Sequence, residues 1–294
     1  MNKTITSLIA GASVLAATAN AEITLTDDLG VYGYIDTAYV SADDLSTSEG
    51  LAAEFELGFS FTPVDSAWSA VAEISFDNDE TDAEFETVTI TYAASDELSF
   101  TVGNILSYQG FETYDATGLY QFSYLGLGGA PVYSAAYAVG GSVDYVTDEY
   151  SIGFWIGEVD NEASVEFLGK YTGVEDLTLT FVYANDPTYE SYNFWASYVI
   201  DAFTFAVEYV NNDFEGAADE DTYLMGLVNY AFGDAAVTAR YTAGEVDGVD
   251  FDRYTISPSY VFSDNVLGLV EWSYDDVDGA AGDTQLAAEL LFTF

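Results

Sequence analysis

Carboxylates are the reactive groups that this chain has in abundance. It carries 51 Asp and Glu residues against 4 Lys and Arg, with no His and no Cys, and its net charge is −47. Without His, Ser-His and Asp-His catalytic arrangements and histidine metal sites are excluded, and without Cys so are disulfides and thiol chemistry. Such a polyanion also repels nucleic acid. The composition therefore predicts a protein that attracts cations, and we expect no catalytic residue, no cofactor and no dedicated metal site.

Four of the carboxylates are spaced for one face of a β-sheet, where they would form an acidic wall. Glu54 and Glu56 alternate with apolar residues, as expected for a strand with one polar and one apolar face. Two residues at equal distances from the middle of a hairpin connection lie opposite each other. Counting in this way places Asp36 opposite Glu56, and Glu56 opposite Glu73. Like charges directly opposite each other destabilise a sheet. The row therefore either binds cations, has raised pKa values, or lies in wide water without specific binding.

The basic side chains beyond Lys3 are Lys170, Arg240 and Arg253. By the same alternation all three point away from the apolar face. We expect Arg240 to meet an acid of a long loop, Glu112 or Asp115. The alternative is that each basic residue pairs with a neighbouring acid on its own face, for which the candidates are Glu166, Glu208 and Glu271.

The elements that must position these side chains are β-strands. Residues 53–62 alternate strictly between apolar and polar, and the pattern recurs along the chain. Each strand runs about 9–11 residues, the length that crosses a bilayer at a tilt, whereas no apolar run approaches the about 20 residues of a spanning helix. Phe, Tyr, Trp and Leu crowd one face and charges occupy the other, which favours a transmembrane β-barrel. A soluble sandwich with the aromatic residues inside is the alternative.

Turn signals set the number of strands. Short turns centred on Asp recur along the chain and alternate with longer acidic connections, a pattern typical of barrels with tight turns at one end and longer loops at the other. The count predicts an all-β, antiparallel up-and-down barrel of about sixteen strands, with about eighteen or fourteen as alternatives. The longer connections are expected near residues 43–49, 77–84, 160–162, 186–190, 211–221, 245–250 and 275–283.

One interval between short turns is much longer than the others. It contains residues 107–131, the third external loop, which we expect to fold inward and narrow a water-filled pore. The residues expected at this constriction are Tyr108, Glu112, Tyr114, Asp115, Tyr120, Phe122 and Tyr124. The next strand is expected over 132–145, and its inward side chains are small enough to leave room for the loop. The alternative is that the aromatic residues of the loop cap the external rim.

The N-terminal region has the pattern of an export signal. Lys3 precedes an apolar run that ends in Ala19-Asn20-Ala21, which is typical of a cleaved secretory signal peptide. We therefore expect a signal peptide over residues 1–21 and a single outer-membrane β-barrel domain over residues 22–294.

Two stretches carry a family resemblance. Phe294 follows Phe292 and Leu290 on one strand face, and residues 103–124 read GNILSYQGFETYDATGLYQFSY, with Pro-Val-Tyr at 131–133. Together they resemble Gram-negative outer-membrane porins, closest to the OmpL-like β-barrel porin family. The resemblance implies a protein that is not an enzyme and forms a homotrimer in contact with outer-membrane lipid. It also implies that Phe294 is a C-terminal signal read by the outer-membrane assembly machinery. The chain departs from trimeric diffusion porins in having too few basic residues for a cationic cluster opposite the loop.

These observations lead to one functional expectation and two alternatives. The expectation is a passive outer-membrane channel for small hydrophilic solutes and ions, with a preference for cations because its walls are acidic. One alternative is a substrate-specific channel in which the aromatic residues of the loop bind sugars. The other is a non-conducting structural or adhesive barrel. A salty habitat is a further explanation for the acidity.

Overall fold

The computed structural model describes residues 22–42, 50–78, 83–112, 114–133 and 136–294. The expected signal peptide, residues 1–21, lies outside the described residues. The strands are β1 (Ile23–Thr26), β2 (Leu29–Ala42), β3 (Gly50–Phe61), β4 (Trp68–Asp77), β5 (Glu84–Ala93), β6 (Leu98–Leu106), β7 (Tyr137–Val146), β8 (Tyr150–Val159), β9 (Glu162–Val174), β10 (Leu177–Asn185), β11 (Tyr189–Ile200), β12 (Phe203–Phe214), β13 (Asp221–Phe232), β14 (Ala235–Val246), β15 (Val249–Ser263), β16 (Val266–Val277) and β17 (Asp283–Thr293). Two short 3₁₀ turns, η2 (Ala116–Gly118) and η3 (Leu127–Gly129), lie between β6 and β7. No helix among these residues is long and apolar enough to cross a membrane.

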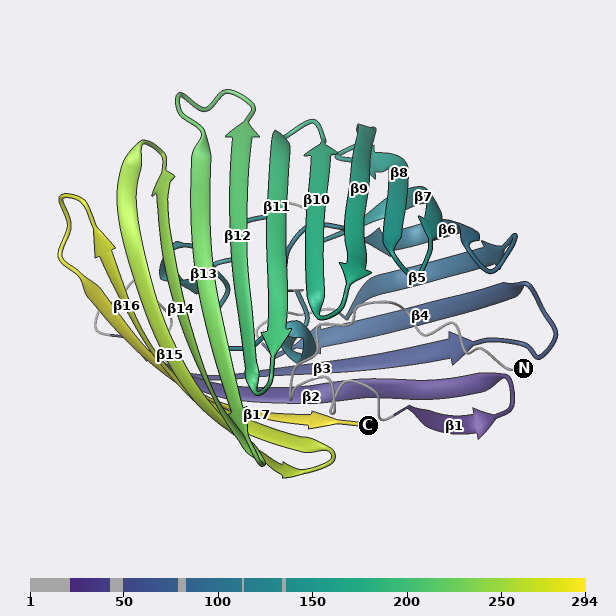
Figure 1. The fold of residues 1–294 in the computed structure, drawn as a ribbon, viewed down its shortest axis with the longest axis horizontal. Helices are drawn as coiled ribbons and strands as arrows, with labels where there is room; N and C mark the ends of the chain where they lie inside the picture. Colours follow the sequence, from purple (N-terminus) through teal and green to yellow (C-terminus); the bar gives the residue numbers. More distant parts are fainter. Residues whose placement is uncertain (1–21, 43–49, 79–82, 113, 134–135) are drawn as a thin grey trace.

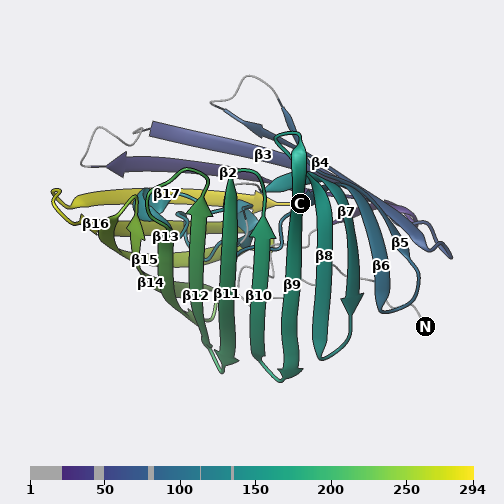
Figure 2. The ribbon, with the colours of Figure 1, turned by 90° about the horizontal axis from the view of Figure 1, so that it is seen from above.

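The strands form a closed barrel. Each strand from β2 to β17 pairs antiparallel with the next, and β17 pairs back with β2, so the predicted sixteen-stranded up-and-down barrel is confirmed. Figure 1 shows the wall from β9 to β15 with β2 to β5 running across behind it. The same succession of neighbouring strands is seen from above in Figure 2.

One additional strand was not predicted. The short β1 pairs with the beginning of β2, with Ile23 opposite Val31. Phe294 exchanges two backbone hydrogen bonds with Gly33, of 2.9 and 3.0 Å. β1 therefore borders the part of β2 that lies beyond the end of β17. Its four residues are too few to reveal a periodicity of two.

The two faces of the wall differ as the alternation predicts. In β12, Phe205 and Val207 are 44% and 51% exposed, whereas Ala206 and Glu208 are 3% and 1% exposed. Large apolar side chains point outward around the barrel, so the soluble sandwich with a buried aromatic face is wrong.

The predicted contrast between long loops and short turns is partly wrong. Only Asp160 and Asn161 separate β8 from β9, and only Asp247 and Gly248 separate β14 from β15. All four residues have positive φ, between 52° and 75°, which is the backbone of a tight type I′ hairpin. Acidic composition was interpreted as loop length, although Asp-Asn and Asp-Gly are also the residues that this turn requires.

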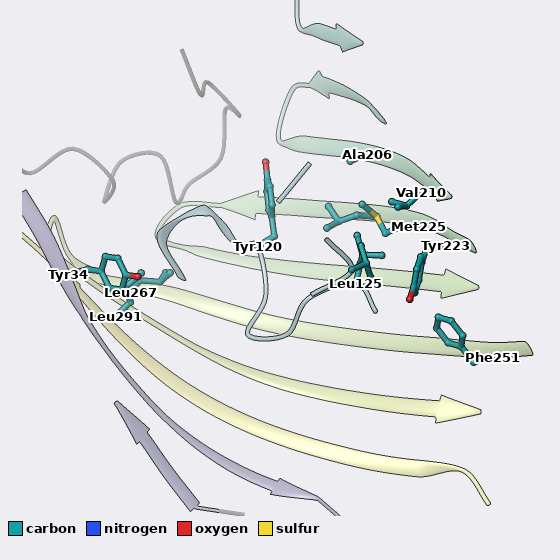
Figure 3. Packing of buried hydrophobic residues seen from close by; sticks show 12 residues of the cluster. Tyr34, Tyr120, Leu125, Ala206, Val210, Tyr223, Met225, Phe251, Leu267 and Leu291 are labelled. Atoms are coloured by element: carbon teal, nitrogen blue, oxygen red, sulfur yellow. The ribbon is translucent and has the colours of Figure 1, made fainter. Parts of the chain in front are cut away.

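The connection between β6 and β7 folds into the barrel. Tyr120 and Leu125 belong to the same buried apolar cluster as Val210 of β12 and Met225 of β13, and Figure 3 shows Leu125 next to Met225. β7 begins at Tyr137, so its predicted start at 132 is wrong. Val132 belongs instead to the internal apolar cluster, and its carbonyl oxygen accepts a hydrogen bond of 2.6 Å from Asn212 Nδ2.

Candidate functional site

The inward connection, described over residues 107–112, 114–133 and 136, is called the inner loop below. One of its sides faces β9 to β16, where Arg240 lies near the middle of β14. Arg240 Nη1 is 2.8 Å from Glu112 Oε2, and Nη2 donates to the carbonyl oxygen of Tyr124 at 2.6 Å and to Ser123 Oγ at 3.0 Å. Arg240 is only 3% exposed. It therefore holds the inner loop from behind rather than facing water.

Arg253 is also buried behind the inner loop. Its guanidinium pairs with Asp275, lies 3.8 Å from Glu271 and donates to Ser123 Oγ at 3.1 Å, and the residue is 1% exposed. Of the two expectations for the basic residues, the loop contact describes Arg240, and pairing with acids of the wall describes Arg253.

Acidic side chains of the wall hold the backbone of the inner loop. Glu166 accepts from the Tyr108 N–H at 2.8 Å, and Glu208 from the Phe111 N–H at 3.0 Å. Glu271 accepts from the N–H and the hydroxyl of Ser123, at 3.2 and 2.5 Å. These acids are predicted from the sequence only as partners for the basic side chains, and their bonds to the loop backbone are not predicted. No signal in the sequence distinguishes a carboxylate that binds a loop from one that faces water.

The apolar surface beneath the inner loop was also missed. Met225 and Leu227 of β13 point inward and are 1% and 4% exposed, although inward residues were expected to be polar. Residues 223–228 are apolar on both faces. This break in the alternation is a signal that could have located the surface on which the loop packs.

The other side of the inner loop faces carboxylates. One oxygen each from Asp115 of the loop, Glu56 of β3 and Glu86 of β5 lie within 4.8 Å of one another. The Tyr137 hydroxyl donates to Asp115 Oδ1 at 3.1 Å. Burial, followed by the charges of Glu86 and Glu73, raises the pKa of Asp115 to about 7. We call Glu56, Glu86 and Asp115 the acidic triad; Glu86 was not among the predicted residues.

The predicted register of the acidic wall is wrong by two residues on both sides of β3. Asp36 lies opposite Glu54 and not Glu56, while Glu56 lies opposite Ser75 and not Glu73. A shift of two residues keeps every side chain on its own face, so the alternation cannot detect it. The register depends on which residue lies at the centre of each connection between two strands, and the predicted centres were wrong.

Tyrosines space the acids of this wall. The Tyr32 hydroxyl donates to Glu73 Oε1 at 2.6 Å, and the Tyr34 hydroxyl donates to Glu54. Asp36 has a different neighbour, the carboxyl group of Glu289. The wall is therefore an array of acids and phenols, without a basic residue among these contacts.

The aromatic residues of the inner loop lie inside the barrel, so the expectation that they cap the rim is wrong. Tyr108 donates to Asp144 Oδ1 at 2.6 Å, and Tyr124 to the carbonyl oxygen of Tyr114 at 2.5 Å. The Tyr120 ring stacks on Phe111 with 5.7 Å between centroids. Phe122 is partly exposed.

The small residues of β7 leave room for a side chain of the neighbouring strand as well as for the inner loop, whose Tyr108 bonds to Asp144 of β7. A Cβ on Gly140 would lie 2.6 Å from Trp155 Nε1, so the indole of β8 fills this space. Tyr108 occupies a similar gap at Gly153, where a Cβ would lie 2.9 Å from its ring.

The two remaining predicted residues lie apart from these groups. Lys170 Nζ is 5.9 Å from the centroid of the Trp195 ring and forms no ion pair with any residue that the structure describes. The Phe294 ring stacks on Phe55, with 6.4 Å between centroids, at the seam of β17 and β2.

The closed antiparallel barrel with a connection folded into its interior is the fold of outer-membrane β-barrel proteins. OmpT of Vibrio cholerae, expressed in the outer membrane, superposes with a TM-score of 0.72 at 14% identity, covering 93% of this chain and 100% of its own. A variant of Rh. blastica porin gives 0.66 at 17% identity, with 90% and 100% covered. A protein engineered for asymmetric conductivity gives 0.68 at 17% identity, with 91% and 100% covered.

These likenesses concern the fold. No protein-family model matches the chain, and no curated protein sequence matches it. The superpositions alone show that the chain has the architecture of an outer-membrane barrel.

Proposed function

We propose that this protein is a porin: a passive channel of the outer membrane for small hydrophilic solutes and ions, with a preference for cations. The pathway runs between the inner loop and the wall formed by β2 to β5. No chemical step takes place in it.

The observation that carries the proposal is that acidic side chains of the barrel interior are exposed to water, whereas its two arginines are buried. Glu54, Glu73 and Glu86 are partly exposed in the barrel interior, whereas Arg240 and Arg253 are 3% and 1% exposed behind the loop. A buried and paired charge contributes little to the potential of an aqueous path, while an unpaired charge beside water contributes fully. The potential along the wall is therefore negative, although the barrel contains arginines.

The mechanism is electrostatic and steric. Carboxylates along a narrow aqueous path raise the local concentration of cations and lower that of anions. The inner loop limits the size of the solute because it occupies one side of the lumen. Its buried contacts with the wall keep it in place, so the width of the path does not depend on a mobile segment.

The decisive experiment measures the reversal potential of single channels in a KCl gradient across a planar bilayer. We expect the sign that denotes K⁺ permeating faster than Cl⁻. Glu54→Gln with Glu73→Gln should reduce the preference, because two partly exposed charges of the path are removed. The matched control is Glu190→Gln, at a carboxylate that accepts from the exposed Tyr192 at 3.0 Å, which should leave the potential unchanged.

Other outcomes contradict the proposal in distinct ways. A preference for Cl⁻ removes the electrostatic mechanism. The absence of conductance favours a non-conducting surface barrel. Liposome swelling that depends on the identity of a sugar rather than on its size favours a substrate-specific channel.

The proposal has consequences for export and assembly. We propose that residues 1–21 are removed as a signal peptide and that Phe294 is read by the outer-membrane assembly machinery. A homotrimer of the OmpL-like porin type is part of the same proposal and rests on the resemblance of residues 103–124.

A further inference from the structure

We propose that a hollow inside the inner loop binds the methylated ammonium group of a small organic cation, of the class of choline and tetramethylammonium. The rings of Tyr114, Tyr124 and Tyr133 line this hollow, which is called the tyrosine hollow below. Its role in conduction rests on the proposed function, because it borders the path assigned there. Binding itself can be measured without any conductance.

The three tyrosine rings meet at angles that suit a cation. The centroid of the Tyr114 ring lies 6.5 Å from that of Tyr124 and 6.4 Å from that of Tyr133. The planes of these two rings are inclined to that of Tyr114 by 50° and 65°, so the rings form corners rather than a face-to-face stack. A cation in the corner between two such rings lies within about 6 Å of both centroids, which is the range of a cation–π contact.

The rest of the lining decides which cations the tyrosine hollow accepts. Apolar side chains complete it, from Leu125, Pro131 and Val132. Glu112 is the charged residue of the lining, and its oxygens already accept from the Tyr120 N–H at 2.9 Å and from Arg240 at 2.8 Å. A metal ion or a primary ammonium would therefore find few free acceptors to replace its water. A quaternary ammonium carries no N–H group that needs an acceptor, and its methyl groups match an apolar wall.

The charges around the tyrosine hollow favour a cation. The carboxyl groups of Glu54 and Asp115 lie close enough to act on the Tyr124 phenol. None of the described residues that line the hollow is basic, and Arg240, which contacts Glu112 of the lining, is neutralised within that ion pair. Negative charge therefore remains beside Tyr124, where it adds to the attraction of the rings for a cation.

The tyrosine hollow is open to water on one side. It encloses about 290 Å³ between its atoms, part of which is open to solvent. Pro131 of the lining is exposed, and the three tyrosines are partly exposed. The trimethylammonium end of choline can therefore enter from the open side while its hydroxyl end stays in water. A cation held there adds a positive charge near Asp115 and opposes the passage of K⁺.

The test is saturation transfer from the purified full-length barrel to the methyl protons of choline, measured by nuclear magnetic resonance in a non-ionic detergent. It is done in about 1 M KCl, where a Debye length of about 3 Å suppresses diffuse binding to the acids. We expect half-saturation at roughly 10⁻³–10⁻² M. The uncharged analogue of choline in which carbon replaces the nitrogen has the same shape. It should bind at least about threefold more weakly, because the rings then have no charge to attract.

Tyr114 offers a matched pair of variants, because its ring is the one that contacts both other rings and its hydroxyl is buried without a hydrogen-bond partner. Tyr114→Leu removes the ring and keeps an apolar side chain, and it should weaken choline binding by about threefold to thirtyfold. Tyr114→Phe keeps the ring and is the control, which should bind choline within about twofold of the wild type. Circular dichroism of both variants verifies that the barrel is intact.

Two results would overturn the inference. One is wild-type protein that gives no saturable signal with choline in this range. The other is equal binding of choline and its uncharged analogue, or equal binding of choline by Tyr114→Leu and Tyr114→Phe, which would leave an apolar hollow without selection for charge.

Conduction supplies a separate readout. In planar bilayers, choline near its half-saturating concentration should reduce the K⁺ current of the wild type and of Tyr114→Phe more than that of Tyr114→Leu. Choline binding by a barrel that does not conduct would reject the proposed channel and keep the site. K⁺ conductance by a barrel that does not bind choline would do the reverse.

Discussion

Asp115 is the residue through which the inner loop brings charge to the wall of β3 and β5. It faces the carboxyl groups of Glu56 and Glu86 within the triad, and Glu73 and Glu54 are close enough to act on it. The only hydroxyl that donates to it among the described residues is that of Tyr137. Asp115 therefore gains a proton more readily than an ordinary aspartate, and its charge depends on pH near neutrality.

This property predicts a pH-dependent selectivity. The pKa of Asp115 is raised from 3.8 to about 7, so the side chain is charged above that pH and neutral below it. Cation preference, measured as a reversal potential without divalent ions, should therefore decline as the pH falls through about 7. Asp115→Asn should have the lower preference above about pH 7, match the wild type below it, and show no such step. An unchanged titration in Asp115→Asn would refute the assignment.

The raised pKa of Asp115 also makes the free energy of unfolding depend on pH. Between about pH 4 and 7 the native state binds this proton more tightly than the unfolded chain does, so the contribution of Asp115 to the free energy of unfolding decreases as the pH rises. Stability gained through this group is fully present below its unfolded pKa and is lost through about pH 7.

At the scale of elements, the inner loop is held on one side by ion pairs and hydrogen bonds that water does not reach. Breaking a buried ion pair is far more costly than breaking one at the surface, because the remaining charge stays buried. Glu112 is 7% exposed and Arg240 is 3% exposed, so this pair meets that condition.

Arg240→Met should therefore lower the free energy of unfolding by about 3–5 kcal/mol, since Glu112 is left buried and unpaired. Adding Glu112→Met should recover much of the loss, because the unpaired charge is removed. The measurement is urea unfolding in lipid vesicles, followed by tryptophan fluorescence. Lys170→Met serves as the control, with an expected change within about 1 kcal/mol, the value of a cation–π contact. Equal losses in Arg240→Met and Lys170→Met would contradict this account.

The elements also mark the limit of what could be predicted. The alternation from Glu54 onward predicts the strands, their faces and their number, because burial repeats with a period of two. The register of Asp36 and Glu73 was beyond reach, since a two-residue slip leaves the faces unchanged. The start of β7 was misplaced because Val132 and Tyr133 have the apolar character expected of strand residues. They pack in the internal apolar cluster instead. Which acids bind the loop depends on contacts between segments far apart in sequence, such as Glu271 and Ser123.

At the scale of the whole molecule, the charge of −47 opposes compactness. The repulsion among 51 acidic residues is screened over about 30 Å at 0.01 M salt but over only about 3 Å at 1 M. The charge repulsion that destabilises the barrel therefore depends on the salt concentration.

The thermal unfolding temperature should consequently rise with KCl concentration, and equally with NaCl, since screening does not depend on the identity of the cation. Circular dichroism in a non-ionic detergent measures it. A temperature that falls with added salt would show that ion pairs outweigh the repulsion.

The contacts of the inner loop have a mechanical consequence. Glu166, Asn193, Glu208, Arg240, Thr255 and Glu271 belong to β9, β11, β12, β14, β15 and β16, and each bonds to the loop. Backbone ladders join only adjacent strands and resist bending of the sheet weakly, whereas a segment bonded to many strands acts as a brace across the curve. The inner loop therefore fixes the curvature of the wall from β9 to β16. When the membrane compresses the barrel laterally, the strands β2 to β5, which lack these bonds among the described residues, should deform most, and they carry the acidic wall of Asp36, Glu54, Glu56 and Glu73.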